Sequence, residues 1–358
     1  FISYDLSKAD VIVSLESDFL NSGPAAMVYA RQFGRKRSLE SVETPNRLYA
    51  VESAPSVSGS LADHQCTVKS GEIPSIAYQL AKACGVASAP AAAGTAPDWL
   101  SAVADDLTKA KGRSVVIPGE FQPESVHLAA YAMNVALGNV GQTVRVLEGV
   151  EPDNTHSLEE LAADLNNGHI ETLIILSQNP VYDAPASLNF EAAIRKARLV
   201  VRLGQFFDET SRWSHWHVPE AHYLETWSDC RAFDGSITVQ QPLIEPLYQG
   251  KSAHEVLSIL LGKPDQNSHE IVKGFWQSEY KGADFDTWWK TSLHNGWVAG
   301  TAIAAINAPA SPALPALEVA PAGAYEVVLR PDPSIGDGSY ANNGWLQELP
   351  KPQTKTTW

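Results

Sequence analysis

Short apolar runs alternate with amphipathic segments along the first part of the chain. Val11–Ser14, Arg47–Glu52 and Ser114–Ile117 are apolar or β-branched runs of strand length. Asp98–Lys111 carries apolar residues at helical spacing, and Pro123–Leu137 is a helix-like segment followed by a glycine. A further helix is expected to begin at Ser70. The pattern predicts parallel strands joined by helices.

A second set of the same kind follows. Ser157 with Glu160 three residues later forms a predicted capping box, and so does Ser252 with Glu255. The predicted elements are strands at Thr143–Leu147, Thr172–Leu176 and Arg198–Leu203, with a helix at Leu188–Ala197. Thr172–Leu176 is too apolar to alternate, as expected for a strand buried on both faces of a parallel sheet.

The pattern changes after residue 262. Ser268–Tyr280 and Asp284–His294 are predicted helices rich in tryptophan, Thr301–Gly323 is an Ala/Pro-rich connector, and Tyr325–Leu329 is a predicted strand. We therefore predict an α/β protein with two Rossmann-like parallel-sheet lobes, a helical extension and an extended C-terminal tail. The predicted boundaries are 1–142 and 143–265 for the lobes, 266–300 for the extension and 301–358 for the linker and tail.

Composition excludes several classes of protein. The 358 residues carry a net charge of −15, which disfavours binding to nucleic-acid phosphates. No apolar run approaches the roughly 18 residues of a membrane span. The three cysteines are Cys66, Cys84 and Cys230, too few for a four-thiolate iron–sulfur cluster and wrongly spaced for a zinc finger. Their odd number leaves one disulfide open.

Candidate chemistry lies in the loops at the carboxyl ends of the predicted strands, where open α/β sheets bind ligands. The loop after Leu176 begins Ser177-Gln178-Asn179-Pro180 and has polar groups suited to a nucleotide or phosphate, although such turns are common in ordinary loops. The loop after Ser14 carries Glu16 and Asp18, which would repel a diphosphate. Acid–base chemistry by this pair competes with the simpler interpretation of solvated loop acids.

A histidine-rich segment is the most metal-like cluster. His215 and His217 would share one face of a strand, and His222 and Glu225 would lie on one helical turn. Trp, Val and Pro residues are interleaved with them and no second cluster supports a metal site, so a packed strand and turn is the simpler interpretation of the segment. Gly138–Gly141 resembles half a dinucleotide fingerprint, but it follows a helix and is interpreted as a helix stop.

Several segments together resemble the molybdopterin oxidoreductase superfamily of the dimethyl-sulfoxide-reductase type, in that family's order. They are Ala9–Phe19, Val115–Gly141, Leu173–Pro185, Phe206–Glu225 and Phe233–Pro246. The tail Arg330–Trp358 and the segment Tyr49–His64 are similar to the large iron–sulfur subunits of bacterial alternative complex III, a quinol-oxidising membrane complex. The resemblance covers most of the chain.

The chain departs from the family at the cofactor-binding loops. Glu16 stands where the family has glycine, and Asp18 and Phe19 replace its first Asn-Pro pair. In the second loop Asn179 and Pro180 remain, but Ser177 replaces the glycine. His215 stands where the family often has Asp, and Ser236 replaces an Arg. Since the family's cofactor carries a diphosphate, a glutamate in place of glycine adds bulk and negative charge.

The resemblance implies a fragment of a redox-complex subunit that keeps the fold and has lost the cofactor. We expect no catalytic residue and no metal ligand in it, and iron–sulfur clusters only in missing parts of the parent. The expected partners are other subunits and the cluster-bearing region, and the expected location is peripheral, on the periplasmic face of the bacterial inner membrane. The mid-fold start at Phe1 favours an excised piece of a longer protein.

Two alternatives remain open. One is a genuine catalytic fragment that binds molybdopterin guanine dinucleotide. Its cofactor-binding residues would be Ser177, Gln178, Asn179, Glu209, Thr210, Asp234 and Gly235. The other is an unrelated α/β protein that binds a sugar or a nucleotide.

Overall fold

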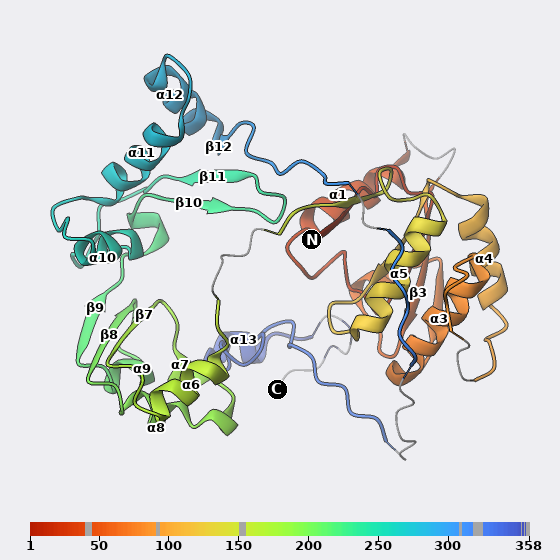
Figure 1. The fold of residues 1–358 in the computed structure, drawn as a ribbon, viewed down its shortest axis with the longest axis horizontal. Coiled ribbons are helices and arrows are strands. Elements are labelled where there is room, and N and C mark those ends of the chain that lie inside the picture. The colour runs from red at the N-terminus through yellow and green to blue at the C-terminus, as the bar shows by residue number, and fades with distance from the viewer. Residues whose placement is uncertain are drawn as a thin grey trace. The chain divides into compact units, whose positions relative to one another are not determined.

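The computed structural model describes residues 1–39, 45–90, 94–149, 155–307, 310–317, 325–351, 353 and 355. The chain divides into two compact units. Unit 1 comprises Phe1–Gly149, Ile303–Gly336 and Asn343–Trp358, and unit 2 comprises Val150–Ala302 and Asp337–Asn342. The first 149 residues of unit 1 are drawn red to yellow in Figure 1, and the first strands and helices of unit 2 are green.

The described part of unit 1 contains a four-stranded parallel sheet in the order β4-β3-β2-β5. Its strands are β2 (Val11–Leu15), β3 (Arg47–Glu52), β4 (His64–Thr67) and β5 (Ser114–Pro118). All five residues of β2 are buried, because the strand lies in the middle of the sheet. A separate antiparallel pair is formed by β1 (Ile2–Tyr4) and β6 (Val144–Val146). In the sequence these strands come just before and just after the strands of the main sheet.

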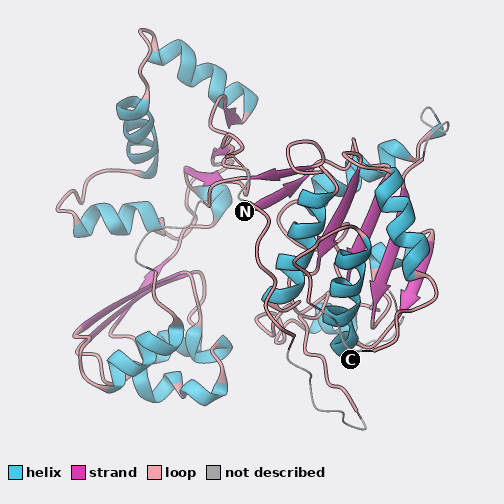
Figure 2. Ribbon diagram, turned by 45° about the vertical axis from the view of Figure 1, so that its right-hand side comes forward, coloured by secondary structure: helices cyan, strands magenta, loops and turns pink. Residues whose placement is uncertain are grey.

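Helices pack along this sheet, as Figure 2 shows. The alternating residues Val11, Val13 and Leu15 of β2 belong to one core with apolar residues of three helices. These helices are α3 (Ile73–Ala83), α4 (Leu100–Lys109) and α5 (Glu124–Ala136). The unit also contains α1 (Ala26–Lys36), the short α2 (Val57–Ser60), a 3₁₀ turn at Ser70–Glu72 and α13 (Gly344–Glu348).

Unit 2 has a three-stranded parallel sheet among its described residues, in the order β7-β8-β9. The strands are β7 (Thr172–Leu176), β8 (Leu199–Gly204) and β9 (Trp216–Pro219). The associated helices are α6 (Leu158–Asn166), α7 (Pro180–Asp183), α8 (Phe190–Ile194) and α9 (Glu209–Arg212), with a 3₁₀ turn at Ala186–Leu188. Leu165, Ile194 and Val200 are fully buried in the core of this sheet.

The rest of unit 2 is an antiparallel sheet supported by an aromatic cluster. The strands are β10 (Ser228–Arg231), β11 (Ile237–Gln240) and β12 (Trp297–Val298), and the helices are α10 (Ala253–Leu260), α11 (Ser268–Glu279) and α12 (Phe285–Asn295). Trp276 and Trp289 are buried against Ile237 and Val239. The indole Nε1 of Trp276 donates to Asp229 at 2.8 Å, so the polar edge of this buried ring is satisfied.

The predicted α/β class with parallel sheets in two lobes is confirmed, and so are both capping boxes, at Ser157 and Ser252. The predicted strand at Tyr325–Leu329 is wrong, since the segment is not assigned to any strand. A strand needs a neighbouring backbone to pair with, and this segment is instead held through side chains: Glu326 accepts a hydrogen bond from the Gly71 amide, and Arg330 forms an ion pair with Glu16. The helix predicted at Leu188–Ala197 is shorter, because Asn189 adopts a left-handed conformation just before α8.

The three cysteines are free thiols, with Cys66 and Cys84 buried and Cys230 exposed. Burial raises the pKa of Cys84 to about 12, so this thiol is held in its neutral form. Among the described residues, no helix has the length and apolar character to cross a bilayer.

We predict that Gly119→Ala destabilises unit 1. A Cβ on Gly119 would lie 2.1 Å from the backbone oxygen of Glu16, so the substitution forces two buried loops apart. The expected loss is about 1–3 kcal/mol of unfolding free energy, measured by urea denaturation. Gly34→Ala in α1 is the matched control, because nothing lies within 4 Å of its added Cβ. It should stabilise the helix by about 0.5–1 kcal/mol, and equal effects of the two substitutions would contradict the prediction.

Candidate functional site

The loop that follows β2 places Glu16 at the carboxyl end of the unit 1 sheet. The Glu16 amide donates to the Val51 carbonyl at 2.8 Å, which continues the pairing of β2 with β3 by one residue. The residue has a φ of +57°, in the left-handed region that favours glycine. This turn directs the side chain into the protein, where it is 2% exposed. The close approach of Gly119 to the Glu16 carbonyl fixes the loop from the other side.

Hydrogen-bond donors from four segments surround the Glu16 carboxylate. Ser53, just after β3, donates its amide to Oε1 at 3.1 Å and also its hydroxyl. Ser70, after β4, donates its hydroxyl to Oε2 at 2.8 Å. Gln122, after β5, donates Nε2 to Oε2 at 2.5 Å. Arg330, from the tail, places Nη2 2.5 Å from Oε1. The position where an open sheet binds a ligand is therefore filled by the chain's own carboxylate.

The environment of Glu16 favours its charged form. Burial by itself would raise the pKa of this carboxyl. The hydrogen bonds from Ser53 and Ser70, together with the positive charge of Arg330, outweigh burial and hold the pKa below its ordinary value of 4.5. The carboxylate is thus ionised at neutral pH, and its charge is matched by one guanidinium group.

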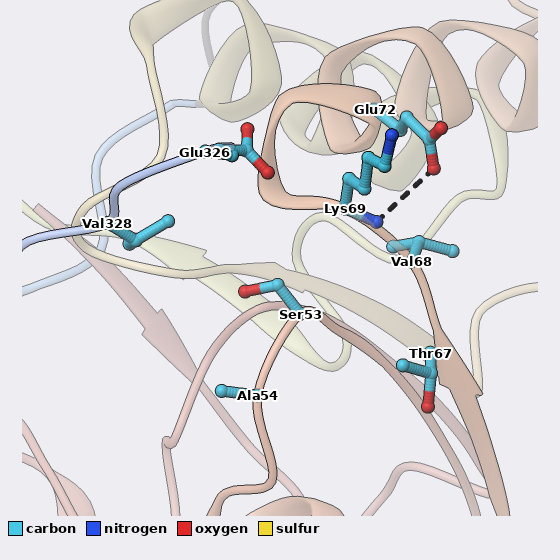
Figure 3. Close-up of a pocket in the computed structure, with 8 residues that line it drawn as sticks. All are labelled: Ser53, Ala54, Thr67, Val68, Lys69, Glu72, Glu326 and Val328. Atoms are coloured by element: carbon cyan, nitrogen blue, oxygen red, sulfur yellow. Dashed lines mark hydrogen bonds between the residues drawn. The ribbon is translucent and has the colours of Figure 1, made fainter. Parts of the chain in front are cut away.

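An open pocket of about 590 Å³ lies beside this site. Figure 3 shows Ser53 between Glu326 and Val328 of the tail on one side and Thr67 and Val68 on the other. The lining residues are Ser53, Ala54, Thr67, Val68, Lys69, Glu72, Glu326 and Val328. Glu326 accepts a hydrogen bond of 2.6 Å from the amide of Gly71, so the tail closes over the carboxyl ends of β3 and β4. The lining contains the carboxylates of Glu72 and Glu326 and the ammonium group of Lys69.

Two further carboxylates at this edge are engaged inside the protein. Asp18 accepts hydrogen bonds from the amide and the hydroxyl of Ser58, each at 2.8 Å. Glu52 is buried and accepts from the Ser56 hydroxyl at 2.7 Å and from the Gln65 amide at 2.6 Å. Glu16 and Asp18, the pair weighed for acid–base chemistry, therefore act as internal hydrogen-bond acceptors in this structure.

The loop after β7 in unit 2 has the same construction. Ser177 has a φ of +66°, and its amide donates to the Leu203 carbonyl at 2.9 Å, as that of Glu16 does to Val51. Asn179 accepts hydrogen bonds from the amide and the hydroxyl of Thr210, at 3.2 and 2.7 Å. The Val181 amide in turn donates to the Thr210 hydroxyl at 3.1 Å.

Each of these contacts has a counterpart in unit 1. Asp18 binds Ser58 as Asn179 binds Thr210, and the Leu20 amide donates to the Ser58 hydroxyl at 3.0 Å. Each parallel sheet thus carries a copy of the same loop, in which Glu16 and Asp18 of unit 1 correspond to Ser177 and Asn179 of unit 2. The main difference is the left-handed residue, which is a long acid in unit 1 and the short Ser177 in unit 2.

The predicted cofactor-binding residues are partly brought together. Asn179 donates Nδ2 to Glu209 at 2.9 Å and accepts a hydrogen bond from the Thr210 amide, both residues of α9. Ser177 and Gln178, in the same loop as Asn179, are exposed. Ser177 donates its hydroxyl to Glu220. Asp234 and Gly235 lie elsewhere, in the turn between β10 and β11, where Asp234 accepts from the Ser236 amide and Gly235 has a φ of +82°. There these two residues shape a hairpin turn.

Negative charge dominates the unit 2 loop. The buried guanidinium of Arg202 pairs with Asp208 at 2.8 Å. Hydrogen bonding by Asn179 lowers the pKa of Glu209, so this exposed acid is ionised. Burial raises the pKa of Asp183, and the charge of Asp337 adds to that rise. An anionic ligand at Ser177 would meet Glu209 and Glu220, which disfavours a diphosphate in the loop as it stands.

The histidine-rich segment makes local contacts. Nδ1 of His215 accepts from the Val200 amide at 3.0 Å, and Nδ1 of His217 lies 3.0 Å from the Ser211 hydroxyl. His222 and Glu225 form a capping box around a 3₁₀ turn at Tyr223–Glu225. Within the described ranges, no three His, Cys, Asp or Glu side chains are grouped so that they could hold a metal ion.

Sequence reasoning missed most of the residues around Glu16. Gln122 lies in a loop that the strand pattern marked for inspection, and Ser53 directly follows a predicted strand, so position relative to the strands could have indicated both. No sequence signal connects Arg330 with Glu16, because the two residues lie near opposite ends of the chain.

The sequence matches no known protein family, and no curated protein is significantly similar to it. Among solved structures, the chain is similar to acetylene hydratase from Pelobacter acetylenicus, with 10% sequence identity and a TM-score of 0.47. The match covers 74% of this chain and 49% of that chain, so the chain spans about half the length of this neighbour.

We predict that Glu16→Gln destabilises unit 1 in a pH-dependent manner. Because the folded pKa is lowered, the charged carboxylate stabilises the fold above pH 4.5, and this stabilisation is lost as the pH falls through the folded pKa. The expected loss at pH 7 is about 1–3 kcal/mol, shrinking towards zero in acid. Urea denaturation across this pH range measures it, with Glu348→Gln on the surface of α13 as the control. A pH-independent difference would refute the assignment.

Proposed function

We propose that this chain is a molybdopterin-oxidoreductase-like region of a membrane-associated respiratory redox complex, of the quinol-oxidising alternative complex III type. In this proposal the region is structural. It holds no cofactor of its own and docks the cluster-bearing region and neighbouring subunits, on the periplasmic face of the membrane. The support for the family is the set of ordered sequence segments described above, and the support for a structural role is the chemistry at the two strand-end loops.

The observation that carries the structural role is the position of the Glu16 carboxylate. It lies at the carboxyl end of the unit 1 sheet and takes the hydrogen bonds of Ser53, Ser70, Gln122 and Arg330. A diphosphate-bearing cofactor needs such donors for itself and needs room close to the backbone. The residues present in unit 1 do not fit that group.

Exposed apolar side chains support the docking role. On α10 and just after it, Leu257, Leu260 and Leu261 are 46%, 57% and 77% exposed. In the preceding loop Leu243 and Tyr248 are 76% and 83% exposed. Exposed large apolar residues on neighbouring segments are typical of protein interaction surfaces. Separately, the net charge of −15 favours partners with basic surfaces.

A second candidate function is catalytic binding of molybdopterin guanine dinucleotide through unit 2. The observation in its favour is that Ser177, unlike Glu16, is too short to fill the loop, and that Ser177 and Gln178 are exposed. The acids Glu209 and Glu220 at the same loop weigh against it. We therefore rank this candidate second.

Metal and pterin analysis of the full-length protein, purified with its complex, tests the proposal. We expect molybdenum and tungsten far below one atom per chain and no released pterin after oxidative denaturation. A molybdopterin-containing enzyme processed in parallel controls for recovery of both. Stoichiometric metal with pterin would overturn the structural role and favour the second candidate.

Leu260→Lys combined with Leu261→Lys tests the docking surface. Both side chains are exposed, so we expect the stability of the chain to change by no more than about 0.5 kcal/mol. Recovery of the other subunits with the tagged full-length variant should fall at least several-fold. Met27→Lys, at an 85% exposed position on α1, is the matched control for an added charge. Unchanged recovery with the α10 variant would refute docking through this surface.

A further inference from the structure

The two faces of the parallel sheet in unit 2 are covered unequally. Leu173, Ile175 and Val200 point to one face and are buried in a core with residues of α6 and α8. The helices of this lobe gather on one side of the three strands in Figures 1 and 2. The opposite face, termed here the second face, is mainly apolar. Its residues are Thr172, Ile174, Leu176, Leu199, Val201, Leu203, Trp216 and Val218.

Solvent reaches most of the second face. Trp216 is 67% exposed, Thr172 is exposed, and Ile174 and Val201 are half-buried. Ile174, Val201 and Trp216 are paired in the register of β7, β8 and β9, so they form one apolar row across the sheet. Parallel sheets are almost always covered on both faces. The second face is therefore a surface that lacks its cover among the described residues.

The repeated loop relates the second face to a face of the unit 1 sheet. Val13 lies three residues before Glu16, and Ile174 lies three residues before Ser177, so both take the same place in their sheets. Val13 is fully buried, whereas Ile174 is half-buried. The two lobes thus share strands and a loop and differ in what covers this face.

Helices cover the matching face in unit 1. Val13 belongs to a core with apolar residues of α3, α4 and α5. Tyr49, its register partner in β3, is 6% exposed and donates its hydroxyl to Asp106 of α4 at 2.7 Å. Unit 1 therefore shows which kind of element fits such a face.

The nearest helix of unit 2 does not supply this cover. The segment leading into α10 is held at the end of β9, because the Lys251 amide donates to the Pro219 carbonyl at 2.9 Å. The side chains of Leu257 and Leu260 on α10 are nevertheless 46% and 57% exposed. They are not packed against the apolar face of a sheet.

Charges at the carboxyl edge of the sheet favour one direction for a helix on the second face. Glu209 and Glu220 follow β8 and β9, and the hydrogen bond from Asn179 lowers the pKa of Glu209, so that this acid is ionised. A helix that starts at this edge brings its positive dipole end to these acids. In unit 1 the chain enters α3 at the same edge, where Ser70 donates to Glu16.

We propose that the second face of the unit 2 sheet binds an amphipathic α-helix of another subunit, which runs antiparallel to the strands with its N-terminus beside Glu209 and Glu220. Apolar side chains of this helix pack on Ile174, Val201 and Trp216. The proposal rests on the docking role proposed above, and it adds a second surface and the kind of partner that fits it.

Photo-crosslinking in the purified complex tests the class of partner. The full-length protein carries p-benzoylphenylalanine at Thr172 or at Leu176, positions about 13 Å apart along β7 at about 3.3 Å per residue. Because a helix rises about 1.5 Å per residue, we expect the two crosslinks about nine residues apart on one other subunit. The Leu176 product should lie nearer the N-terminus of that segment. The same group at Glu191, exposed on α8, is the control and should not reach it.

Four outcomes would overturn the proposal. Crosslinks separated by about four residues would indicate an extended segment in place of a helix. Crosslinks to α10 would show that the chain covers the face itself, and crosslinks to a second copy would show self-association. No crosslink from either position would show that the face is free in the complex.

A second measurement needs no photoreactive residue. Trp216→Ala removes an exposed side chain from the centre of the apolar row, so we expect an unchanged unfolding midpoint in urea. Recovery of the crosslinked subunit with the tagged variant should fall at least several-fold. Phe206→Ala, at a 77% exposed position in the loop after β8, is the matched aromatic control. Unchanged recovery with Trp216→Ala would contradict the proposal.

These results can be separated from those on the proposed function. The metal and pterin content reports on the structural role, and the α10 variant reports on the other docking surface. A failure at the second face leaves both of those assignments in place, and stoichiometric metal with pterin leaves the crosslinking result unaffected.

Discussion

The hydrogen-bonded Glu16 carboxylate holds the carboxyl edge of the unit 1 sheet together. A buried charge is tolerated only when donors and a countercharge surround it. Here the donors are Ser53, Ser70 and Gln122, and the countercharge is Arg330. Because these residues come from segments far apart in the sequence, one side chain ties the loops after three strands to the tail. The same contacts remove the space and the donors that a ligand at this edge would use.

The tail depends on this arrangement and on a second anchor in the core. Leu314 is buried among the core residues of unit 1, and the Pro315 carbonyl accepts a hydrogen bond of 2.8 Å from the Tyr78 hydroxyl. Further along, Glu326 and Arg330 bind the strand-end loops, while Tyr325, Val327 and Leu329 are 82–91% exposed. The extended segment thus uses alternate side chains for attachment and leaves an apolar row facing outward.

The repeated loop explains how two lobes of one architecture come to have different surface chemistry. The backbone contacts after β2 and β7 are the same. In unit 1 Asp18 accepts a hydrogen bond from the Ser58 hydroxyl on α2, and in unit 2 Asn179 accepts one from the Thr210 hydroxyl on α9. With the framework fixed by backbone geometry, the side chain at the left-handed residue is free to vary. Glu16 fills its site, and Ser177 leaves its loop exposed among acids.

The sequence by itself determined the elements whose signals are local. The strands β2, β7 and β8 follow from short, mostly apolar runs, and the helices after Ser157 and Ser252 follow from capping boxes. Each of these signals depends on residues within a few positions of one another. The sequence also identified Glu16 and Ser177 as the positions that distinguish the two loops. It gave no sign of α1 or of the β10–β12 sheet.

Only the tertiary structure decided what Glu16 does. From the sequence it was one acid in a loop, expected to repel a diphosphate, and its partner Arg330 lay in a tail predicted to contain a strand. Folding brings Arg330 and the serines to the carboxylate, and the chain satisfies a buried charge that no local pattern could have foretold. The physical reason is that hydrogen bonds and ion pairs form between groups that are close in space. When the two groups come from distant segments, no local pattern in the sequence shows that they will meet.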